Sequence, residues 1–381
     1  MTARKMNGRK RIGIAGAGSI ALGTAALLHE NRHDPVLWSP SGKGTFVFKT
    51  QPLRAQGVFE AEFAPQVASS AKGLAEGCDA LILCLPANGH KTVMDALLPH
   101  IREGQHVIIS SHASFGALYM MRELAARGVS APVTAWGTTI VSGRRQAATV
   151  RVNTVRNRVD ICTVPETASS EALDLCQSLF GDRFKPRDGL LAITLSNLNP
   201  QNHLGIAMCN ITRMERGEDW SQGQNVTPKV GRLMEQLDLE RLAIAKALDL
   251  DVKTIFEHFH QSFHVPMGPI SDMNQEMHRH GYSGLGPGTA DSRYVTEDTP
   301  YGLVVTAALG RLVGRSASLH EAGIQIFSAM YGRDFTQEND LLTALDIERF
   351  SLTDLQQAAR TGLLPQARAG AKDNELIREK T

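Results

Sequence analysis

The feature that most constrains the fold of this chain is a glycine-rich turn close to its N-terminus. Residues 11–17 have the pattern of a buried strand and residues 18–31 that of a helix, and the turn Gly16-x-Gly18-x-x-Ala21 joins them. Gly16 permits a tight turn, and Gly18 lets the backbone approach a pyrophosphate that rests on the helix N-terminus. In this strand–turn–helix setting the turn predicts a dinucleotide site. The cofactor contacts expected in it are Gly16, Gly18, Ser19, Ile20 and Ala21.

The rest of the N-terminal half alternates apolar strands with helices. Unbroken apolar runs predict the strands, and segments of helical spacing lie between them. An alternating stretch at 44–62, which includes Thr45-Phe-Val-Phe48, predicts a small β excursion. The whole pattern is typical of a parallel sheet covered on both faces. Strands are expected at 36–38, 79–85, 105–110, 133–136 and 153–164, and helices at 66–76, 90–101, 115–127 and 169–180.

From residue 190 the pattern changes to apolar residues at helical spacing. Residues 264–298 form a long irregular stretch, which in a compact domain usually marks a functional or disordered loop. We therefore expect an α/β protein, with an N-terminal doubly wound Rossmann domain over 1–185, an all-α C-terminal domain over 186–365 and a mobile tail over 366–381. Helices are expected at 190–216, 227–248, 251–263, 300–313 and 316–331, with Ser316 and Thr336 as plausible N-caps.

Composition argues against several classes of function. The formal net charge of +1 gives no overall field that would favour nucleic acid or an anionic membrane. The 5 cysteines are an odd number without CxxC spacing, so neither a disulfide framework nor a zinc site is expected. No secretory segment precedes the first strand and no apolar run is long enough to cross a membrane, which favours a cytoplasmic location.

The segment after the second predicted strand bears on the choice between NAD and NADP. An acidic residue there usually binds the ribose 2′-hydroxyl of NAD, but Trp38-Ser-Pro-Ser-Gly-Lys-Gly44 contains none. Ser39, Ser41 and Lys43 are suited to a 2′-phosphate instead, so the expected cofactor is NAD(P), with NADP slightly favoured over NAD. Two further cofactor contacts are expected at the carboxyl end of a long apolar strand: Leu85 and Pro86.

Reduction of a C=N or C=O bond needs a proton carrier, a partner that orients it, and a cation for the substrate carboxylate. Histidine, a carboxylate and arginine suit these three roles in turn. The 13 histidines are too many for spacing alone to choose among them. Five of them gather around the irregular stretch without HExxH spacing and with few acids nearby, so no metal site is expected. These five are His258, His260, His264, His278 and His280.

Three motifs in this chain resemble the octopine/nopaline (opine) dehydrogenase family. They are Asn199-Pro-Gln-Asn-His203, Arg293-Tyr-Val-Thr-Glu-Asp-Thr-Pro-Tyr-Gly302 and Gly332-Arg-Asp-Phe335, and the resemblance extends over about residues 10–345. It implies a Rossmann domain and a helical domain arranged as in 6-phosphogluconate dehydrogenase, with the site in the cleft between them. It also implies NAD(P)H-dependent reductive condensation of an amino acid's amine with a 2-oxo acid.

The resemblance further implies roles for single residues. His203 matches the family's catalytic histidine, Asp298 matches its carboxylate partner, and Arg293 matches the arginine that binds a substrate carboxylate. Weaker local similarity places His112 and Thr138 beside the oxo acid. His112 stands where some relatives carry Gln, so the preferred oxo acid stays open. From the residues alone, Asp298 could instead cap the helix that follows it.

Two other functions remain open at this point. Ketopantoate reductase and related enzymes share the two-domain plan and reduce a 2-oxo acid directly, but they rely on a lysine at the start of the helical domain, and residues 195–203 contain none. A non-catalytic dinucleotide sensor could keep the same fold. The expected partners are a 2-oxo acid and an amino acid, without nucleic acid or membrane, and the chain could form a homodimer.

Overall fold

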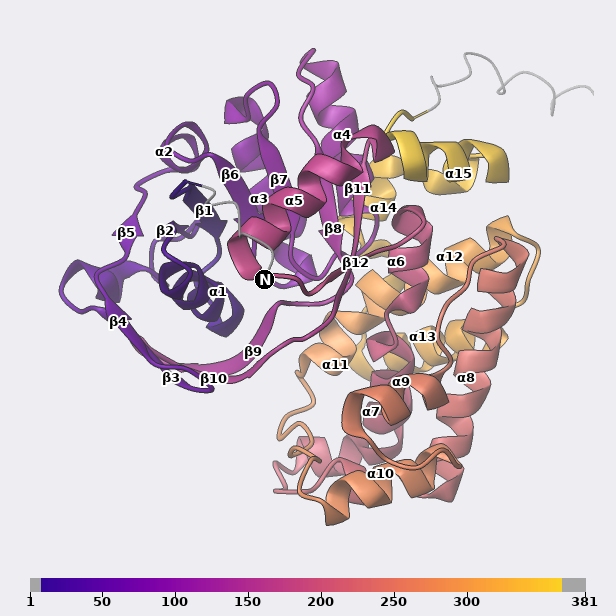
Figure 1. Ribbon diagram of the computed structural model, residues 1–381. Coiled ribbons are helices and arrows are strands. Elements are labelled where there is room, and N and C mark those ends of the chain that lie inside the picture. Colours follow the sequence, from indigo (N-terminus) through magenta and orange to yellow (C-terminus); the bar gives the residue numbers. More distant parts are fainter. Residues whose placement is uncertain (1–7, 365–381) are drawn as a thin grey trace, which may run out of the picture.

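The computed structural model describes residues 8–364, and Figure 1 shows the two parts into which they fold. The first part is built on a sheet and the second is made of helices. The predicted Rossmann domain followed by an all-α domain is therefore confirmed, while the domain limits remain predictions. The tail expected over 366–381 lies outside the described residues.

An eight-stranded sheet forms the centre of the first part, in the order β12-β11-β8-β7-β6-β1-β2-β5. From β5 to β8 this is the doubly wound Rossmann order, which winds in opposite directions on either side of the gap between β1 and β6. Ligands of such sheets bind outside the carboxyl ends of the strands at that gap. The strands are β1 (Arg11–Ala15), β2 (Asp34–Trp38), β5 (Gln66–Val67), β6 (Ala80–Leu83), β7 (His106–Ile109), β8 (Val133–Trp136), β11 (Val159–Val164) and β12 (Phe184–Pro186).

Helices cover both faces of this sheet, as the unbroken apolar strands predict. Alternate residues of one strand enter different cores because a strand's side chains point to opposite faces. In β6, Ile82 packs in the core with α1 (Ser19–Glu30) and α5 (Ser169–Phe180), whereas Leu81 and Leu83 pack with the helices opposite. Those are α2 (Ala71–Glu76), α3 (His90–Leu97) and α4 (Gly116–Ala126). The sheet is not purely parallel as predicted, since β11 runs antiparallel to β8.

A second sheet, in the order β4-β3-β10-β9, curves along α1 (Figure 1). It consists of β3 (Leu53–Gly57), β4 (Ala61–Phe63), β9 (Val141–Gln146) and β10 (Thr149–Val155). The β excursion predicted at 44–62 is correct only in part, because Phe46–Lys49 form a 3-10 turn. The single strand predicted at 153–164 is wrong, because the polar run Arg156-Asn-Arg158 separates β10 from β11.

The second part packs its helices around the long pair α7 (Asn199–Glu215) and α8 (Pro228–Ala247). The stretch 264–298 is less irregular than predicted, since Ile270, Met273 and Met277 repeat at helical spacing and are buried in α10. Both predicted N-caps are wrong: Ala317 precedes α13, and Thr336 lies within a turn that Asp334 caps. The other elements are α6 (Gly189–Ser196), α9 (Ile255–Phe263), α10 (Ile270–Arg279), α11 (Arg293–Thr296), α12 (Val304–Leu312) and α13 (Ser318–Tyr331).

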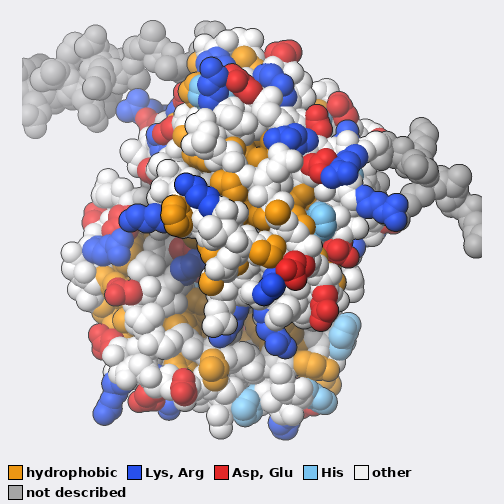
Figure 2. Space-filling view, turned by 90° about the vertical axis from the view of Figure 1, so that its left-hand side faces the viewer, with side chains coloured by type: hydrophobic (Ala, Val, Ile, Leu, Met, Phe, Trp, Pro, Cys, Tyr) orange, Lys and Arg blue, Asp and Glu red, His pale blue; other side chains and the backbone are white. Residues whose placement is uncertain are grey.

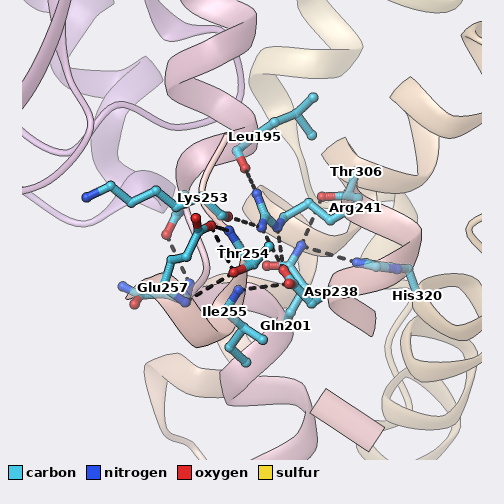
Figure 3. A network of polar contacts seen from close by, with 12 residues as sticks. Leu195, Gln201, Asp238, Arg241, Lys253, Thr254, Ile255, Glu257, Thr306 and His320 are labelled. Carbon is cyan, nitrogen blue, oxygen red and sulfur yellow. Dashed lines mark hydrogen bonds and ion pairs between the residues drawn. The ribbon is translucent and has the colours of Figure 1, made fainter. Parts of the chain in front are cut away.

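A buried polar network holds the start of α7 in place (Figure 3). Arg241 and Asp238 of α8, 0% and 2% exposed at their side chains, form an ion pair with N–O distance 2.7 Å. The Arg241 guanidinium also donates to the carbonyl oxygen of Leu195, at the end of α6. On α7 itself, Gln201 bonds His320 of α13 at 3.2 Å. Gln201 thus fixes the start of α7 against α13, and the ion pair fixes the end of α6 that leads into it.

The end of the described chain returns to the first part. Helices α14 (Asp340–Leu345) and α15 (Leu352–Thr361) lie beside α4 and α6, as Figure 1 shows. A hydrogen bond from Arg122 of α4 to the Ala344 carbonyl oxygen is part of this contact. The two parts are therefore joined by later helices as well as by the connection after β12.

Candidate active site

The glycine turn has the geometry that a dinucleotide requires. Gly16 has φ +137°, and a Cβ atom there would collide with the backbone of Cys84 after β6. A Cβ atom on Gly18 would meet nothing within 4 Å, so its backbone faces open space. Gly18 precedes α1 without a side-chain cap, which leaves N–H groups of the first turn for a pyrophosphate. The residues present therefore fit a dinucleotide cofactor.

Of the predicted cofactor contacts near this turn, some line a cleft and one is buried. Ser19, Ile20, Leu85 and Pro86 line the large cleft described below, at the carboxyl ends of β1 and β6. Ala21 is fully buried and faces Gly16, where it allows close packing and does not line that cleft.

Ser39 follows β2 directly, and its hydroxyl oxygen is buried without a hydrogen-bond partner in the described chain. Ser41 and Lys43 are exposed on the same loop. Arg145 of β9, which the sequence analysis missed, joins this loop to the glycine turn by donating to the carbonyl oxygens of Ala17 and Gly44. A cation thus lies where the loop after β2 meets the turn.

A cleft of about 960 Å³ lies between the two parts and contains residues of both. Its first wall carries the end of the glycine turn, the segment after β6, and residues 110–113 and 138–139. Its second wall carries the start of α7, residues 218–219 and the segment 285–302. The surface is hollowed on the side where β4 and β5 lie in Figure 1, and basic side chains lie around that hollow (Figure 2).

His203 and Asp298 come together at this cleft although 95 residues separate them in sequence. The Nδ1 atom of His203 lies 2.6 Å from Oδ2 of Asp298, and the two side chains are 17% and 19% exposed. An ionised carboxylate can only accept, so Nδ1 carries the hydrogen and Nε2 is left for another partner. Asp298 makes no side-chain cap to the turn that follows, so the capping alternative is wrong.

A close approach of two segments allows this pair to form. Asp298 precedes the π-helical turn Thr299–Leu303, which packs against the first turn of α7. Gly302 of that turn lies so near α7 that a Cβ atom there would be 2.7 Å from the Cβ atom of Pro200. Pro200 is three residues before His203, and Gly302 is four residues after Asp298. Because Gly302 has no side chain, the two segments can approach closely enough for the His203 imidazole to reach the Asp298 carboxylate.

Tyr294 covers one face of the His203 imidazole. Its ring stacks on that of His203 with centroids 3.5 Å apart and planes within 10°. Its hydroxyl donates to Oε1 of Gln222 at 2.6 Å. Burial, followed by the charge of Asp298, raises the pKa of Tyr294 to about 12, so its hydroxyl stays protonated. The stack fixes the ring plane of His203 and keeps water from one face.

Arg293 lines the cleft with its side chain 68% exposed, and it is paired with Glu297 one helical turn later. The hydrogen bond to Glu297 raises the pKa of Arg293, which is a permanent cation. Glu297 also accepts from the backbone N–H of Ala87 at 2.9 Å. This carboxylate therefore connects the segment after β6 to the helix that carries Arg293.

His112 and Thr138 both lie on the first wall of the cleft. His112 is 4% exposed, and burial lowers its pKa from 6.5 to about 3, so the ring is neutral. Its Nε2 accepts from the N–H of Ala117 at 3.3 Å, which places the ring hydrogen on Nδ1. Nδ1 has no partner in the described chain, so a buried donor is available at the cleft.

Several residues of the cleft were not predicted. Tyr294 and Glu297 lie within the motif 293–302, so that motif could have indicated them. Arg144, Arg156 and Asp219 have no spacing or motif that marks them, and only the folded chain brings them to the cleft.

The described part of the chain offers no metal centre and no membrane span. Within residues 8–364, no three His, Cys, Asp or Glu side chains gather in a way that could hold a metal ion. No helix in the same range is both long and apolar enough to cross a bilayer.

Together, the fold and the cleft define a two-domain dehydrogenase of the Rossmann type, with a histidine–carboxylate pair contributed by its helical domain. The family model for the alpha-helical domain of NAD/NADP octopine/nopaline dehydrogenase matches residues 186–331, and the model for ketopantoate reductase PanE/ApbA matches residues 12–164. An opine dehydrogenase from Arthrobacter sp. (strain 1C) is 28% identical over 301 residues, which cover 77% of this chain and 82% of that protein.

Solved structures show the same fold. An octopine dehydrogenase with NADH and L-arginine is 16% identical, with a TM-score of 0.77 over 92% of this chain and 98% of that one. A yersinopine dehydrogenase with NADP+ bound is also 16% identical, with a TM-score of 0.66 and the same coverage. The chain is thus similar to the opine dehydrogenases along most of its length, and these matches support an NAD(P)-dependent oxidoreductase.

Proposed function

We propose that this protein catalyses the NAD(P)H-dependent reductive condensation of a 2-oxo acid with the amine of an amino acid. The observation that best supports this is the His203–Asp298 pair, which lines the same cleft as the glycine turn of the cofactor domain. A proton carrier with an orienting carboxylate is what formation and reduction of a C=N bond require.

The bound cofactor supplies the hydride, and His203 handles the protons. Nε2 of His203 takes a proton from the substrate ammonium, and the free amine then attacks the carbonyl carbon of the oxo acid. The same nitrogen returns the proton to the departing hydroxyl, so that water leaves and a C=N bond forms. Asp298 holds the ring through Nδ1 and stabilises the imidazolium formed in between.

The other predicted residues bind the two substrates. Arg293 receives a substrate carboxylate, for which its guanidinium is suited. We assign the oxo acid to the Nδ1–H of His112 and the hydroxyl of Thr138, since both residues line the cleft on the side of the Rossmann domain. Because His112 is neutral, it donates a hydrogen bond without adding charge.

The cofactor proposed is NADP(H), with NAD(H) as the alternative. Ser39, Ser41 and Lys43 follow β2, where an acid would select NAD, and Arg145 adds a cation at the same place. Lys43→Ala is expected to raise the KM for NADPH and leave the KM for NADH nearly unchanged. Equal effects on both cofactors would refute the preference.

The test of the function is a matrix of 2-oxo acids and amino acids, with cofactor oxidation as the readout. The proposal requires oxidation that depends on both substrates and yields a secondary amine dicarboxylate, identified by mass spectrometry. The match of residues 12–164 to ketopantoate reductase keeps direct reduction as the second candidate. Oxidation that needs no amine and yields a hydroxy acid would favour that reaction.

Location and assembly complete the proposal. The five cysteines of the chain are all free thiols in the described structure, which suits the reducing cytoplasm. A homodimer is the assembly to test by light scattering.

A further inference from the structure

Two arginines on the first wall of the cleft have no acidic partner. Arg144 lies on β9 and Arg156 follows β10, and both line the cleft. Neither side chain makes a hydrogen bond or ion pair to any residue between 8 and 364. By contrast, Arg293 in the same cleft is already paired with Glu297.

Arg156 is the more informative of the two. Burial lowers its pKa, and no nearby carboxylate counters that effect, although the guanidinium remains a cation at any physiological pH. The residue is nevertheless exposed at the cleft, so an anionic ligand can reach the guanidinium. Bidentate bonding to a carboxylate suits this group.

The backbone places Arg156 beside the residues proposed to hold the oxo acid. Its backbone N–H donates to the carbonyl oxygen of Ile140 at 2.9 Å, so Arg156 lies beside the segment that contains Thr138. Val155, just before it, pairs with Val141 across β10 and β9. The unpaired guanidinium therefore belongs to the same wall as Thr138 and His112.

The opposite wall contributes an unpaired carboxylate. Asp219 lines the cleft from the helical domain and has no partner in the described range, while Glu218 beside it is paired with Arg213 at 3.0 Å. An unpaired carboxylate there disfavours a negatively charged side chain on the amine substrate. An extra negative charge is better placed on the substrate held by the Rossmann wall.

We propose that Arg156, with Arg144 on the neighbouring strand, forms an anion site that receives the distal carboxylate of a dicarboxylic 2-oxo acid. This inference rests on the proposed function, since it names the oxo acid that the same cleft accepts. The α-carboxylate and carbonyl of that acid stay with His112, Thr138 and Arg293, and the second carboxylate extends to Arg156.

The kinetic test compares 2-oxoglutarate and oxaloacetate with pyruvate and 2-oxobutyrate. The wild-type enzyme is expected to have the higher kcat/KM for the dicarboxylic acids. Arg156→Ala should lower that value about ten- to one hundredfold, the range for a lost hydrogen bond to a charged group, and change it little for pyruvate. Arg156→Lys should restore part of the loss.

Arg158→Ala is the matched control, because Arg158 is two residues away, is exposed and pairs with Asp160 outside the cleft. It should leave both classes of oxo acid unaffected. An equal loss for all oxo acids in Arg156→Ala, a loss confined to the KM of the cofactor, or a wild-type preference for pyruvate would overturn the proposal.

A binding measurement separates this proposal from the proposed function. Calorimetry of 2-oxoglutarate with the complex of the enzyme and oxidised cofactor, which has no hydride to give, reports the anion site without turnover. If no pair of substrates is turned over but 2-oxoglutarate binds through Arg156, the reaction is wrong and the anion site stands. Absence of binding, or binding equal in Arg156→Ala, overturns the anion site itself.

Discussion

A single methyl group at position 302 is expected to uncouple His203 from Asp298. In Gly302→Ala the new Cβ atom would lie 2.7 Å from the Cβ atom of Pro200, with Pro200 Cγ closer still. Because carbon atoms normally approach to about 3.5 Å, the π-helical turn and α7 must separate by at least about 0.8 Å. Added to the Nδ1–Oδ2 distance of 2.6 Å, this gives about 3.4 Å, beyond the usual hydrogen-bond range.

Two measurable effects follow from that displacement. Turnover should fall by about a hundredfold or more, since a misplacement of about 1 Å in an active site can have that effect. Overpacking should also lower the free energy of unfolding by about 1–3 kcal/mol. Steady-state kinetics and urea denaturation measure the two quantities, and the Kd of the cofactor should stay unchanged because the glycine turn lies on the other wall of the cleft.

The control for this prediction is Gly268→Ala. A Cβ atom on Gly268 would meet nothing within 4 Å, and the residue lies outside the cleft. This variant should match the wild type in both measurements. Wild-type turnover in Gly302→Ala would refute the reasoning that the gap at position 302 sets the geometry of the pair.

Three further perturbations test other parts of the structure. Arg241→Ala should lower the free energy of unfolding by about 3–5 kcal/mol in urea denaturation, because it leaves Asp238 buried without its partner; an effect below about 1 kcal/mol would contradict the role of this pair. Below pH 6.5 the unfolded chain protonates His112 while the folded chain, with its pKa of about 3, does not, so stability should be complete above pH 6.5 and fall by about 1.4 kcal/mol per pH unit below it. His112→Gln should remove that share of the slope in pH-dependent denaturation, and an unchanged slope would show that His112 is not buried as described. Gly18→Val should raise the Kd of the cofactor in fluorescence titrations without unfolding the protein, since the space beside Gly18 is open, and an unchanged Kd would contradict the placement of the pyrophosphate there.

The dinucleotide site was predictable because the residues that define it lie close together in sequence. A strand, a turn that needs Gly16 and Gly18, and a helix N-terminus lie within one short segment, so sequence spacing is enough to identify them. The alternating strands and helices behind it follow from periodicity in the same way. The small sheet was predicted only in part, as the excursion at 44–62, because β3 pairs with β10 far along the chain, as in Arg54 with Thr149, and periodicity carries no information about partners.

The pairing of His203 with Asp298 could not be predicted from local sequence alone. Nothing near His203 indicates that Asp298 lies beside it, and the residues around Asp298 fit a helix cap equally well. The motif resemblance related the two positions, and the folded chain brings them together. Arg156 and Asp219 had neither a motif nor a spacing, because their relevance comes only from the charges that remain unpaired across a folded cleft.

The central claim is that His203 and Asp298 act as one proton-transfer unit, and a double-mutant cycle in kcat tests it most directly. His203→Ala and Asp298→Ala should each lower kcat by about 10²–10⁴-fold. The double variant should lose no more than the more severe single variant, because either change disables the same unit. Losses that multiply in the double variant would mean that the two residues act independently, and the account of the site would then be wrong.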